Sequence, residues 1–261
     1  MSDLNRSAAE HARARIVARA DDLYHDLTLG AVREWRAAHP GRKVIGYLPV
    51  YIPREVVHAA GMLPVGLFGG GEMEIVKGDA YFQSYICHIP RSTIELGLNG
   101  SYDVLDGIVF PSICDVIRNL SGMWQIMFPD KYVRYFDMPQ NFSDAIGGEF
   151  YRRELVAFVH DLEQLAGRAV GDAELRRSIA IYNDNRRLIA ALYAQRVREP
   201  WNVPTSELYL LMRAGNVLAV EEHNAMLQDY LAAVAGRAGA AAQRARVALR
   251  GCSASSRRTT W

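Results

Sequence analysis

Hydrophobic positions follow two different spacings along this chain. Residues 7–38 carry apolar side chains at helical spacing and stop at "HPGRK", which predicts a helix. Between residues 43 and 140, short apolar runs end in Pro or Gly, as buried strands do: "KVIGYLPV", "MLPVGLFGG", "DGIVFPS" and "YVRYFDMP". The stretches between them have helical period: "PREVVHAAG", "CHIPRSTIELGLNG" and "SICDVIRNLSGMWQIMF". This alternation predicts an α/β fold with a Rossmann-like parallel sheet covered by helices on both faces.

The remaining chain is mainly helical. Residues 147–199 predict two amphipathic helices joined by "RAVG", and residues 205–235 predict two shorter helices. The run "RVALRG" near the C-terminus resembles the first strand of another α/β unit. We therefore expect four parts: an N-terminal helical segment (1–40), an α/β domain (41–145), a helical region (146–245) and the start of a second α/β domain (246–261).

Composition excludes several classes of protein. The 261 residues carry 30 basic and 29 acidic side chains, a net charge of +1, so we expect neither nucleic acid nor an anionic membrane as partner. No apolar run approaches the roughly 20 residues of a transmembrane helix. The N-terminus has charges where a secretory signal has its apolar core, which predicts a cytoplasmic protein. Three cysteines, an odd number, argue against a disulfide framework.

Two of these cysteines occupy similar settings. Cys87 follows the apolar run "YFQSYI", Cys114 follows "GIVFPSI", and each opens a predicted helix. We expect both at the carboxyl ends of strands, where open α/β sheets bind ligands and where helix N–H groups stabilise a thiolate. Such thiolates suit a metal or an iron–sulfur cluster. The alternative is that each cysteine is a small buried hydrophobic residue. Their spacing is not a zinc signature.

Neighbouring polar residues add candidate chemistry, each with a structural alternative. His88 is a candidate ligand or proton donor, or simply a hydrogen-bonded histidine. Arg118 shares a helix face with Cys114 and has Asp115 nearby. It is a candidate to balance cluster charge or to bind an acyl thioester or phosphate, or it forms a surface ion pair.

Three other patterns carry weaker signals. "FGGGEM" (68–73) is glycine-rich but lacks the order of a phosphate-binding motif. Glu55 and His58 share a helix face, a pattern that a sheet-covering helix also produces. The chain has no Ser-His-Asp elbow and no H-E-x-x-H motif.

Longer stretches carry a resemblance to a known family. "GYLPVYIPREVVHAAGMLPVGLFGG", "DAYFQSYICHIPRSTIELGL", "YDVLDGIVFPSICDVIRNLSGMWQIMFPDKYVRYFDMPQNF", "IYNDNRRLIAALY" and "EEHNAML" resemble the 2-hydroxyacyl-CoA dehydratase / benzoyl-CoA reductase family. The similarity runs from about residue 40 to 250. The version "FPSICDVIRNLSGMW" is most similar to the benzoyl-CoA reductase branch and, within it, to the smaller cluster-binding (gamma) subunit.

The resemblance implies a specific chemistry. Family members bind a 4Fe–4S cluster through three cysteines of one subunit, between two α/β domains; the first two correspond to Cys87 and Cys114, within the α/β domain 41–145. Arg118 and His88 become candidate substrate-binding residues. The implied enzyme reduces benzoyl-CoA to a cyclohexadiene-1-carbonyl-CoA by single electrons, in anaerobic aromatic degradation. Its implied partners are a paralogous cluster-binding subunit, ATP-hydrolysing electron-activating subunits and reduced ferredoxin. A 2-hydroxyacyl-CoA dehydratase subunit and an inactive, cluster-free scaffold remain as alternatives.

The C-terminus departs from the family pattern. Family members carry the third cysteine after the first strand of the second domain, in a setting like Cys-Glu-Gln-Pro-Pro; here "RVALRG" is followed by "CSASSRRTTW". Cys252 lies near the right place with the wrong neighbours. One set of codons compatible with this tail gives Cys-Glu-Gln-Pro-Pro when read out of frame from Gly251. We therefore expect a frame error or truncation that removes the third ligand and the second domain, and no activity from this chain alone.

Overall fold

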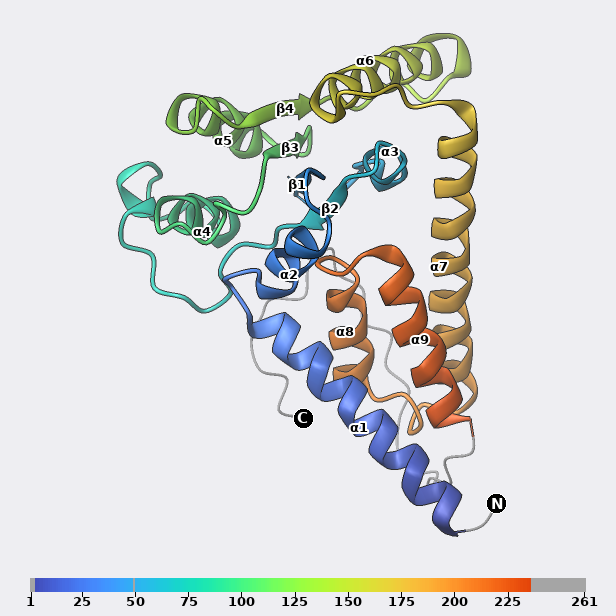
Figure 1. Cartoon of the computed structure of the whole chain (residues 1–261). Coiled ribbons are helices and arrows are strands. Elements are labelled where there is room, and N and C mark those ends of the chain that lie inside the picture. The colour runs from blue at the N-terminus through green and yellow to red at the C-terminus, as the bar shows by residue number, and fades with distance from the viewer. Residues whose placement is uncertain (1–2, 49, 236–261) are drawn as a thin grey trace. The chain divides into compact units, whose positions relative to one another are not determined.

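A computed structural model describes residues 3–48 and 50–235 of the chain (Figure 1). Its elements, in chain order, are α1 (Asp3–His25), α2 (Gly30–Ala38), β1 (Val44–Tyr47), α3 (Arg54–Ala59), β2 (Leu63–Gly66), the 3-10 turn η1 (Gly78–Ala80), α4 (His88–Leu98), β3 (Gly107–Pro111), α5 (Asp115–Met127), β4 (Tyr132–Phe136), the π-helical turn η2 (Asp144–Gly148), α6 (Glu149–Ala166), α7 (Asp172–Arg198), α8 (Thr205–Ala214) and α9 (Val220–Val234).

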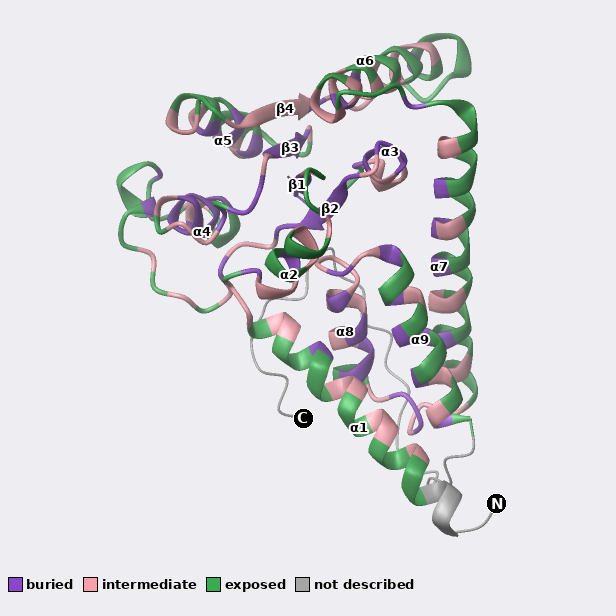
Figure 2. Cartoon of the chain, in the orientation of Figure 1, coloured by how far each residue is buried: buried purple, intermediate pink, exposed green. Residues whose placement is uncertain are grey.

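The four strands form one parallel sheet in the order β2-β1-β3-β4. Every residue of β1, β2 and β3 is buried, whereas β4, one of the two edge strands, is mostly intermediate (Figure 2). The connections between successive strands run through α3, α4 and α5, since parallel neighbours need a crossover. The sheet, its direction and its helical crossovers confirm the predicted α/β fold.

Contacts divide the chain into two compact units, with one boundary after Asp26 and a second within α7, after Ala180. Residues 27–180 form the unit that contains the sheet. The other unit combines the residues up to Asp26 with those from Ile181 onward. The expected division at residues 40, 145 and 245 stays a prediction.

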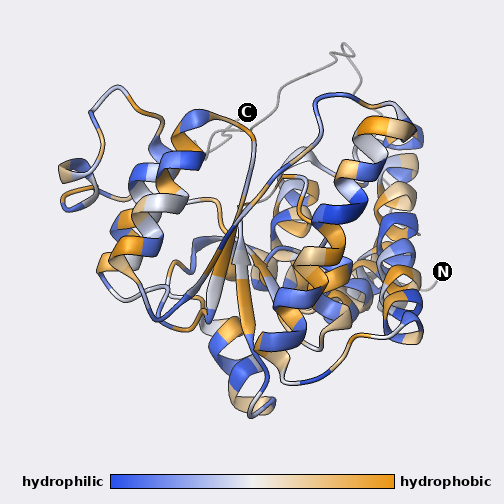
Figure 3. Cartoon of the chain, turned by 90° about the horizontal axis from the view of Figure 1, so that it is seen from above, coloured by the Kyte–Doolittle hydropathy of each residue, from blue (hydrophilic) through white to orange (hydrophobic). Residues whose placement is uncertain are grey.

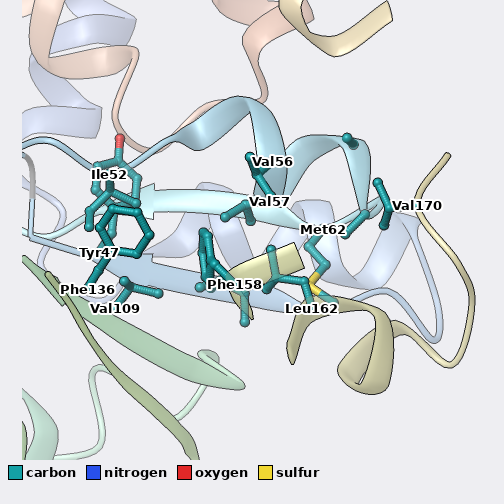
Figure 4. Packing of buried hydrophobic residues seen from close by; sticks show 13 residues of the cluster. Tyr47, Ile52, Val56, Val57, Met62, Val109, Phe136, Phe158, Leu162 and Val170 are labelled. Carbon is teal, nitrogen blue, oxygen red and sulfur yellow. The ribbon is translucent and has the colours of Figure 1, made fainter. Parts of the chain in front are cut away.

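One face of the sheet packs against α3 and α6 (Figures 1 and 4). Alternate strand residues point to this face, among them Ile45, Val109 and Phe136. From α6, Phe158 is fully buried and its ring meets the Phe136 ring edge-on at a centroid distance of 5.4 Å. This aromatic contact fixes α6 against the edge strand of the sheet.

Polar contacts reinforce the same junction. Arg134 of β4 donates to Asp161 at 2.6 Å and to Glu154 at 3.1 Å, both on α6. The Tyr132 hydroxyl donates to Asp161 at 2.8 Å. Alternate residues of β4 thus bind α6, which leaves Tyr135 on the opposite face.

The opposite face of the sheet is covered by α4 and α5 (Figure 1). Trp124 of α5 lies between the rings of Phe110 and Phe128, with centroid distances of 6.2 and 4.3 Å. Gly46 of β1 is closely surrounded, because a Cβ atom there would lie 2.9 Å from side-chain atoms of Leu105 and Leu67. The absence of a side chain at Gly46 therefore leaves room for these two leucines over the middle of the sheet.

The second unit is helical. Helices α8 and α9 both contact α1, and Glu207 of α8 accepts hydrogen bonds from Arg13 of α1 and from the Tyr230 hydroxyl of α9. His223 is buried; it accepts a hydrogen bond from Asn185 at Nδ1 and donates through Nε2 to the Leu211 carbonyl. Helices of the chain carry both hydrophobic and hydrophilic residues, typical of helices with one buried side (Figure 3).

One predicted helix has a different extent in the structure. The expected helix over residues 7–38 is wrong as one element, because it is divided into α1 and α2. Leu29 takes a left-handed conformation, with φ 57°, and this interrupts the helical path just before Gly30. The predicted strand "RVALRG" lies outside the described residues. Among the described helices, none is long and apolar enough to cross a membrane.

Candidate functional site

The site lies where the strands end. Because β3 and β4 are parallel, the segments that follow them, 112–114 and 137–141, lie at the same edge of the sheet. The Met138 N–H donates to the Ser112 hydroxyl at 2.8 Å and so ties these two segments together. This edge is the carboxyl edge predicted to bind a ligand.

Cys114 is placed as the sequence predicted. It follows β3, is exposed, and is the N-cap residue of α5. The Arg118 N–H donates to the Cys114 carbonyl at 3.2 Å, which confirms that the two residues lie one helical turn apart on the same face.

Cys87 is also exposed and is the N-cap residue of α4. The expectation that it follows a buried strand is wrong. The segment between β2 and α4, here named the β2–α4 connection (residues 67–87), contains the 3-10 turn η1 and no strand. Glycines and hydrogen bonds from α4, rather than a sheet ladder, determine the path of this connection.

The pKa of the Cys87 thiol is raised. Burial is the larger cause, and the nearby Cys114 side chain raises this pKa further. A backbone hydrogen bond lowers this pKa but does not outweigh the other two effects. This hydrogen bond acts in the direction expected at a helix N-terminus, and the stabilisation of a Cys87 thiolate stays a prediction. Cys87 and Cys114 are the N-cap residues of α4 and α5, two helices that contact each other.

A cavity of about 510 Å³ opens beside Cys114. Its charged side chains are those of Arg118, Asp115 and Asp137. Tyr135 contributes an aromatic ring with a hydroxyl group at one end. The full lining consists of Ser112, Ile113, Cys114, Asp115, Arg118, Tyr135, Asp137, Met138, Pro139, Gln140, Asn141, Ile146, Gly147 and Phe150. A mostly apolar pocket with a few polar groups is typical of a small-molecule site.

Arg118 is held by an aromatic residue. Its guanidinium carbon lies 5.3 Å from the centroid of the Tyr135 ring. A hydrogen bond with the Tyr135 side chain, followed by charge effects of Tyr135, Asp115 and Asp137, raises the pKa of Arg118. The guanidinium therefore stays charged beside Cys114.

Tyr135 and Asp137 were not identified from the sequence. Tyr135 pairs with Phe110 in the sheet and alternates with the β4 residues that bind α6. The alternation of side chains along "YVRYFDMP" indicates that Tyr135 points to the opposite face from Arg134. Its contact with Arg118 could not be predicted, because it also depends on β4 lying next to β3.

His88 is separated from this pocket. It is the exposed first residue of α4 and does not line the cavity beside Cys114. Its substrate-binding role stays a prediction. Cys252 lies outside the described residues.

The weaker sequence signals have structural explanations. The Gly70 N–H in "FGGGEM" donates to the Ser92 hydroxyl of α4 at 3.0 Å. Glu55 and His58 lie on α3, where His58 Nδ1 is 2.9 Å from the Ser178 hydroxyl. Both patterns join elements of the fold.

Glu95 of α4 is a buried carboxylate, 7% exposed, beside the β2–α4 connection. It accepts hydrogen bonds from the backbone N–H groups of Val76, at 3.0 Å, and Gly78, at 2.8 Å. Burial raises its pKa, but hydrogen bonds from the backbone of residues 76–78 outweigh burial, so its pKa lies below the ordinary value of 4.5.

Protonation of Glu95 at low pH should therefore weaken its hydrogen bonds to the backbone of residues 76–78. Because the folded pKa of Glu95 is lowered, its stabilising effect is fully present above about pH 4.5 and is lost as the pH falls through the lower folded value. We expect amide protection of residues 76–78, measured by hydrogen exchange and corrected for intrinsic rates, to be constant above about pH 5 and to fall at lower pH. Protection that falls instead between about pH 7 and pH 5 would contradict this assignment.

Within the residues that the structure describes, no group of three or more His, Cys, Asp or Glu side chains is arranged to hold a metal ion. Cys87 and Cys114 are thus two thiol donors without a third side chain of these types beside them in this part of the chain. The pair can supply two ligands to a larger group.

Comparisons with known proteins agree with the resemblance seen in the sequence. Residues 49–259 match the family model described as 2-hydroxyglutaryl-CoA dehydratase, D-component. The chain is 61% identical to the C subunit of benzoyl-CoA reductase from Thauera aromatica, over 84% of this chain and 57% of the relative.

Two dehydratase subunits are more distant relatives. Lactoyl-CoA dehydratase subunit beta of Anaerotignum propionicum is 30% identical over 76% of this chain and 52% of the relative. (R)-2-hydroxyglutaryl-CoA dehydratase subunit beta of Acidaminococcus fermentans is 30% identical over 72% of this chain and 50% of the relative. The chain spans about half the length of these relatives. By the family match and by its identity to these subunits, the chain belongs to the 2-hydroxyglutaryl-CoA dehydratase D-component family.

Proposed function

We propose that this chain is part of the smaller cluster-binding subunit of an ATP-dependent benzoyl-CoA reductase, in which Cys87 and Cys114 bind a 4Fe–4S cluster. The observation that carries the proposal is the pairing of two free, exposed cysteines at the N-caps of α4 and α5. They are 27 positions apart in sequence, yet they cap two helices that contact each other, and Cys114 raises the pKa of Cys87.

The chemistry of the donors fits an iron–sulfur cluster. Thiolates are the ligands that such clusters prefer. Burial and the nearby Cys114 side chain raise the pKa of Cys87, and bound iron would oppose both effects and favour the thiolate form of both cysteines. Further ligands have to come from outside the described residues, and Cys252 remains a candidate only by its position in the sequence.

The residues around Cys114 suit a CoA thioester beside such a cluster. When bound, the cluster would supply single electrons at low potential. Arg118 would offset negative charge next to Cys114 and bind the thioester carbonyl or a phosphate. Ile113, Met138 and Phe150 would exclude water from the cavity, which limits loss of electrons to side reactions.

The proposed partners come from the family resemblance and from the 61% identity to a benzoyl-CoA reductase subunit. They are a paralogous cluster-binding subunit, an ATP-hydrolysing electron-activating pair, reduced ferredoxin and benzoyl-CoA. The proposed reaction adds two electrons and two protons to the ring and yields a cyclohexadiene-1-carbonyl-CoA. We propose the cytoplasm of an anaerobically growing cell as its location.

A second candidate is a subunit of a 2-hydroxyacyl-CoA dehydratase. The family model and two relatives at 30% identity carry dehydratase names and support it. The much higher identity to a benzoyl-CoA reductase subunit favours the reductase.

A substrate assay separates the two candidates. The full-length product of the gene, purified anaerobically with its partner subunits, is given ATP and a low-potential reductant together with either benzoyl-CoA or an (R)-2-hydroxyacyl-CoA. We expect ATP-dependent loss of benzoyl-CoA, and no reaction when ATP is omitted. Loss of water from the 2-hydroxyacyl-CoA, with benzoyl-CoA unchanged, would overturn the reductase in favour of the dehydratase.

A further inference from the structure

We propose that Glu95 is a positioning residue that holds the β2–α4 connection against α4 and thereby fixes Cys87 beside Cys114. The proposal deepens the proposed function, since its consequence for cluster binding rests on that function. Its geometric part concerns only the separation and mobility of the two thiols and can be tested without iron.

The β2–α4 connection needs such an anchor. It runs from the end of β2 to Cys87 with η1 as its one regular element. Its first residue, Leu67, still donates to the Tyr47 carbonyl of β1 at 2.8 Å, and the rest of the connection follows no strand. Several of its large apolar side chains are exposed, including Val76, Tyr81 and Tyr85. Apolar burial therefore contributes little at these three positions, although Leu67 and Phe82 of the same connection are buried. Between them the connection depends on polar contacts.

Glu95 provides the charged acceptor among these contacts and is itself buried. Its Oε2 atom lies 3.0 Å from the Val76 nitrogen and 2.8 Å from the Gly78 nitrogen, both donors. A carboxylate accepts hydrogen bonds only, so it matches converging N–H groups. Charged acceptors also make the stronger hydrogen bonds.

The surroundings of Gly78 show how closely the connection lies against α4. A Cβ atom at Gly78 would be 2.3 Å from the Arg91 carbonyl oxygen, a backbone atom that cannot move aside. The absence of a side chain at Gly78 therefore allows its N–H group to reach Glu95.

Two neighbours of Glu95 extend the contact along α4. Arg91 donates to Asp79 at 2.7 Å and to the Ser84 carbonyl at 3.2 Å. The Ser92 hydroxyl accepts from the Gly70 N–H at 3.0 Å. Side chains from one helix thus hold the connection at Gly70, at residues 76–79 and at Ser84.

The same helix carries Cys87 at its N-cap. Because the connection enters α4 at Cys87, its path sets the backbone conformation of that residue. Release of residues 76–78 therefore gives the Cys87 thiol more freedom relative to Cys114, while Cys114 stays fixed by β3 and α5.

Glu95→Gln tests the proposal with little change in shape. The amide oxygen can still accept from both N–H groups, but the variant lacks the negative charge that strengthens these hydrogen bonds. We expect amide protection of residues 76–78 to fall by roughly 5- to 30-fold, since one to two hydrogen bonds to a buried acceptor are weakened. We also expect the yield of Cys87–Cys114 bridging by the shortest effective bifunctional thiol reagent to fall severalfold.

Glu163→Gln is the matched control. Glu163 of α6 also accepts a hydrogen bond from a backbone N–H, that of Val170 at 2.8 Å, away from both cysteines. This variant should lose protection at Val170 and leave bridging of the thiols unchanged. If Glu95→Gln does not fold, Asp79→Asn weakens the contact at the more exposed Arg91 pair and should lower bridging in the same direction.

Unchanged protection of residues 76–78, or unchanged bridging in Glu95→Gln, would overturn the positioning role. Iron content separates this outcome from failure of the proposed function. Reduced bridging in a protein that binds no iron would support the role of Glu95 and contradict the cluster. If wild type and Glu95→Gln bind iron equally and bridging is unchanged, the cluster is supported and the positioning role of Glu95 is contradicted.

Discussion

Cys114→Ser is expected to reduce the iron–sulfur content of the full-length protein by at least about tenfold. Mutation of a residue that only orients a metal ligand lowers the affinity for the metal by about 10- to 100-fold. Loss of a ligand itself should lower this affinity at least as much. Serine keeps the N-cap position of α5 but replaces a soft thiolate by a hydroxyl, which is a poor ligand for iron–sulfur iron. The cluster absorbance of anaerobically reconstituted protein measures the effect.

Ile113→Ser is the matched control for this substitution. Ile113 precedes Cys114 and is 42% exposed, so the change introduces the same hydroxyl at the neighbouring position and leaves both thiols in place. The control should keep its cluster. Full cluster content in Cys114→Ser would show that Cys114 is no ligand and would leave the scaffold alternative standing.

Phe158→Ala is expected to destabilise the protein by about 3–5 kcal/mol. The Phe158 side chain is fully buried and packs against Phe136. The guanidinium carbon of Arg134 lies 5.7 Å from the centroid of the Phe158 ring. Removing the ring leaves a cavity between α6 and the edge strand of the sheet. The urea midpoint, followed by circular dichroism, measures the change in the free energy of unfolding.

Val156→Ala, on the same helix, provides the comparison. Val156 is 57% exposed, so its truncation should change the free energy of unfolding by no more than about 0.5 kcal/mol. Equal effects of the two substitutions would show that α6 is not held to the sheet by this aromatic contact.

The strands were predictable because apolar runs ended by Pro or Gly have few other structures available to them. "DGIVFPS" contains β3, whose five residues are all buried and point alternately to the two faces of the sheet. The break at Leu29 was not predictable, since helical spacing continues across it and the interruption is a matter of one backbone conformation. A similar limit applies to Cys87, whose preceding apolar residues resemble a strand but form none, and of these Tyr81 and Tyr85 are exposed.

The candidate site was predictable in its residues but not in its contacts. Each cysteine was placed before a helix by local pattern, whereas their mutual proximity depends on how α4 and α5 pack on one face of the sheet. Tyr135 is separated from Arg118 by 17 positions, and strand order alone brings them together. Glu95 reads as an ordinary helix residue in sequence, and its role becomes visible only from the backbone N–H groups around it.

The iron and acid-labile sulfide content of the anaerobically purified full-length protein tests the central claim most directly. A 4Fe–4S cluster held by Cys87 and Cys114 predicts about four irons and about four sulfides per polypeptide. Conversion of both cysteines to serine should remove them together. A folded protein that contains no iron, or one that keeps its full iron content without these two thiols, would contradict the account.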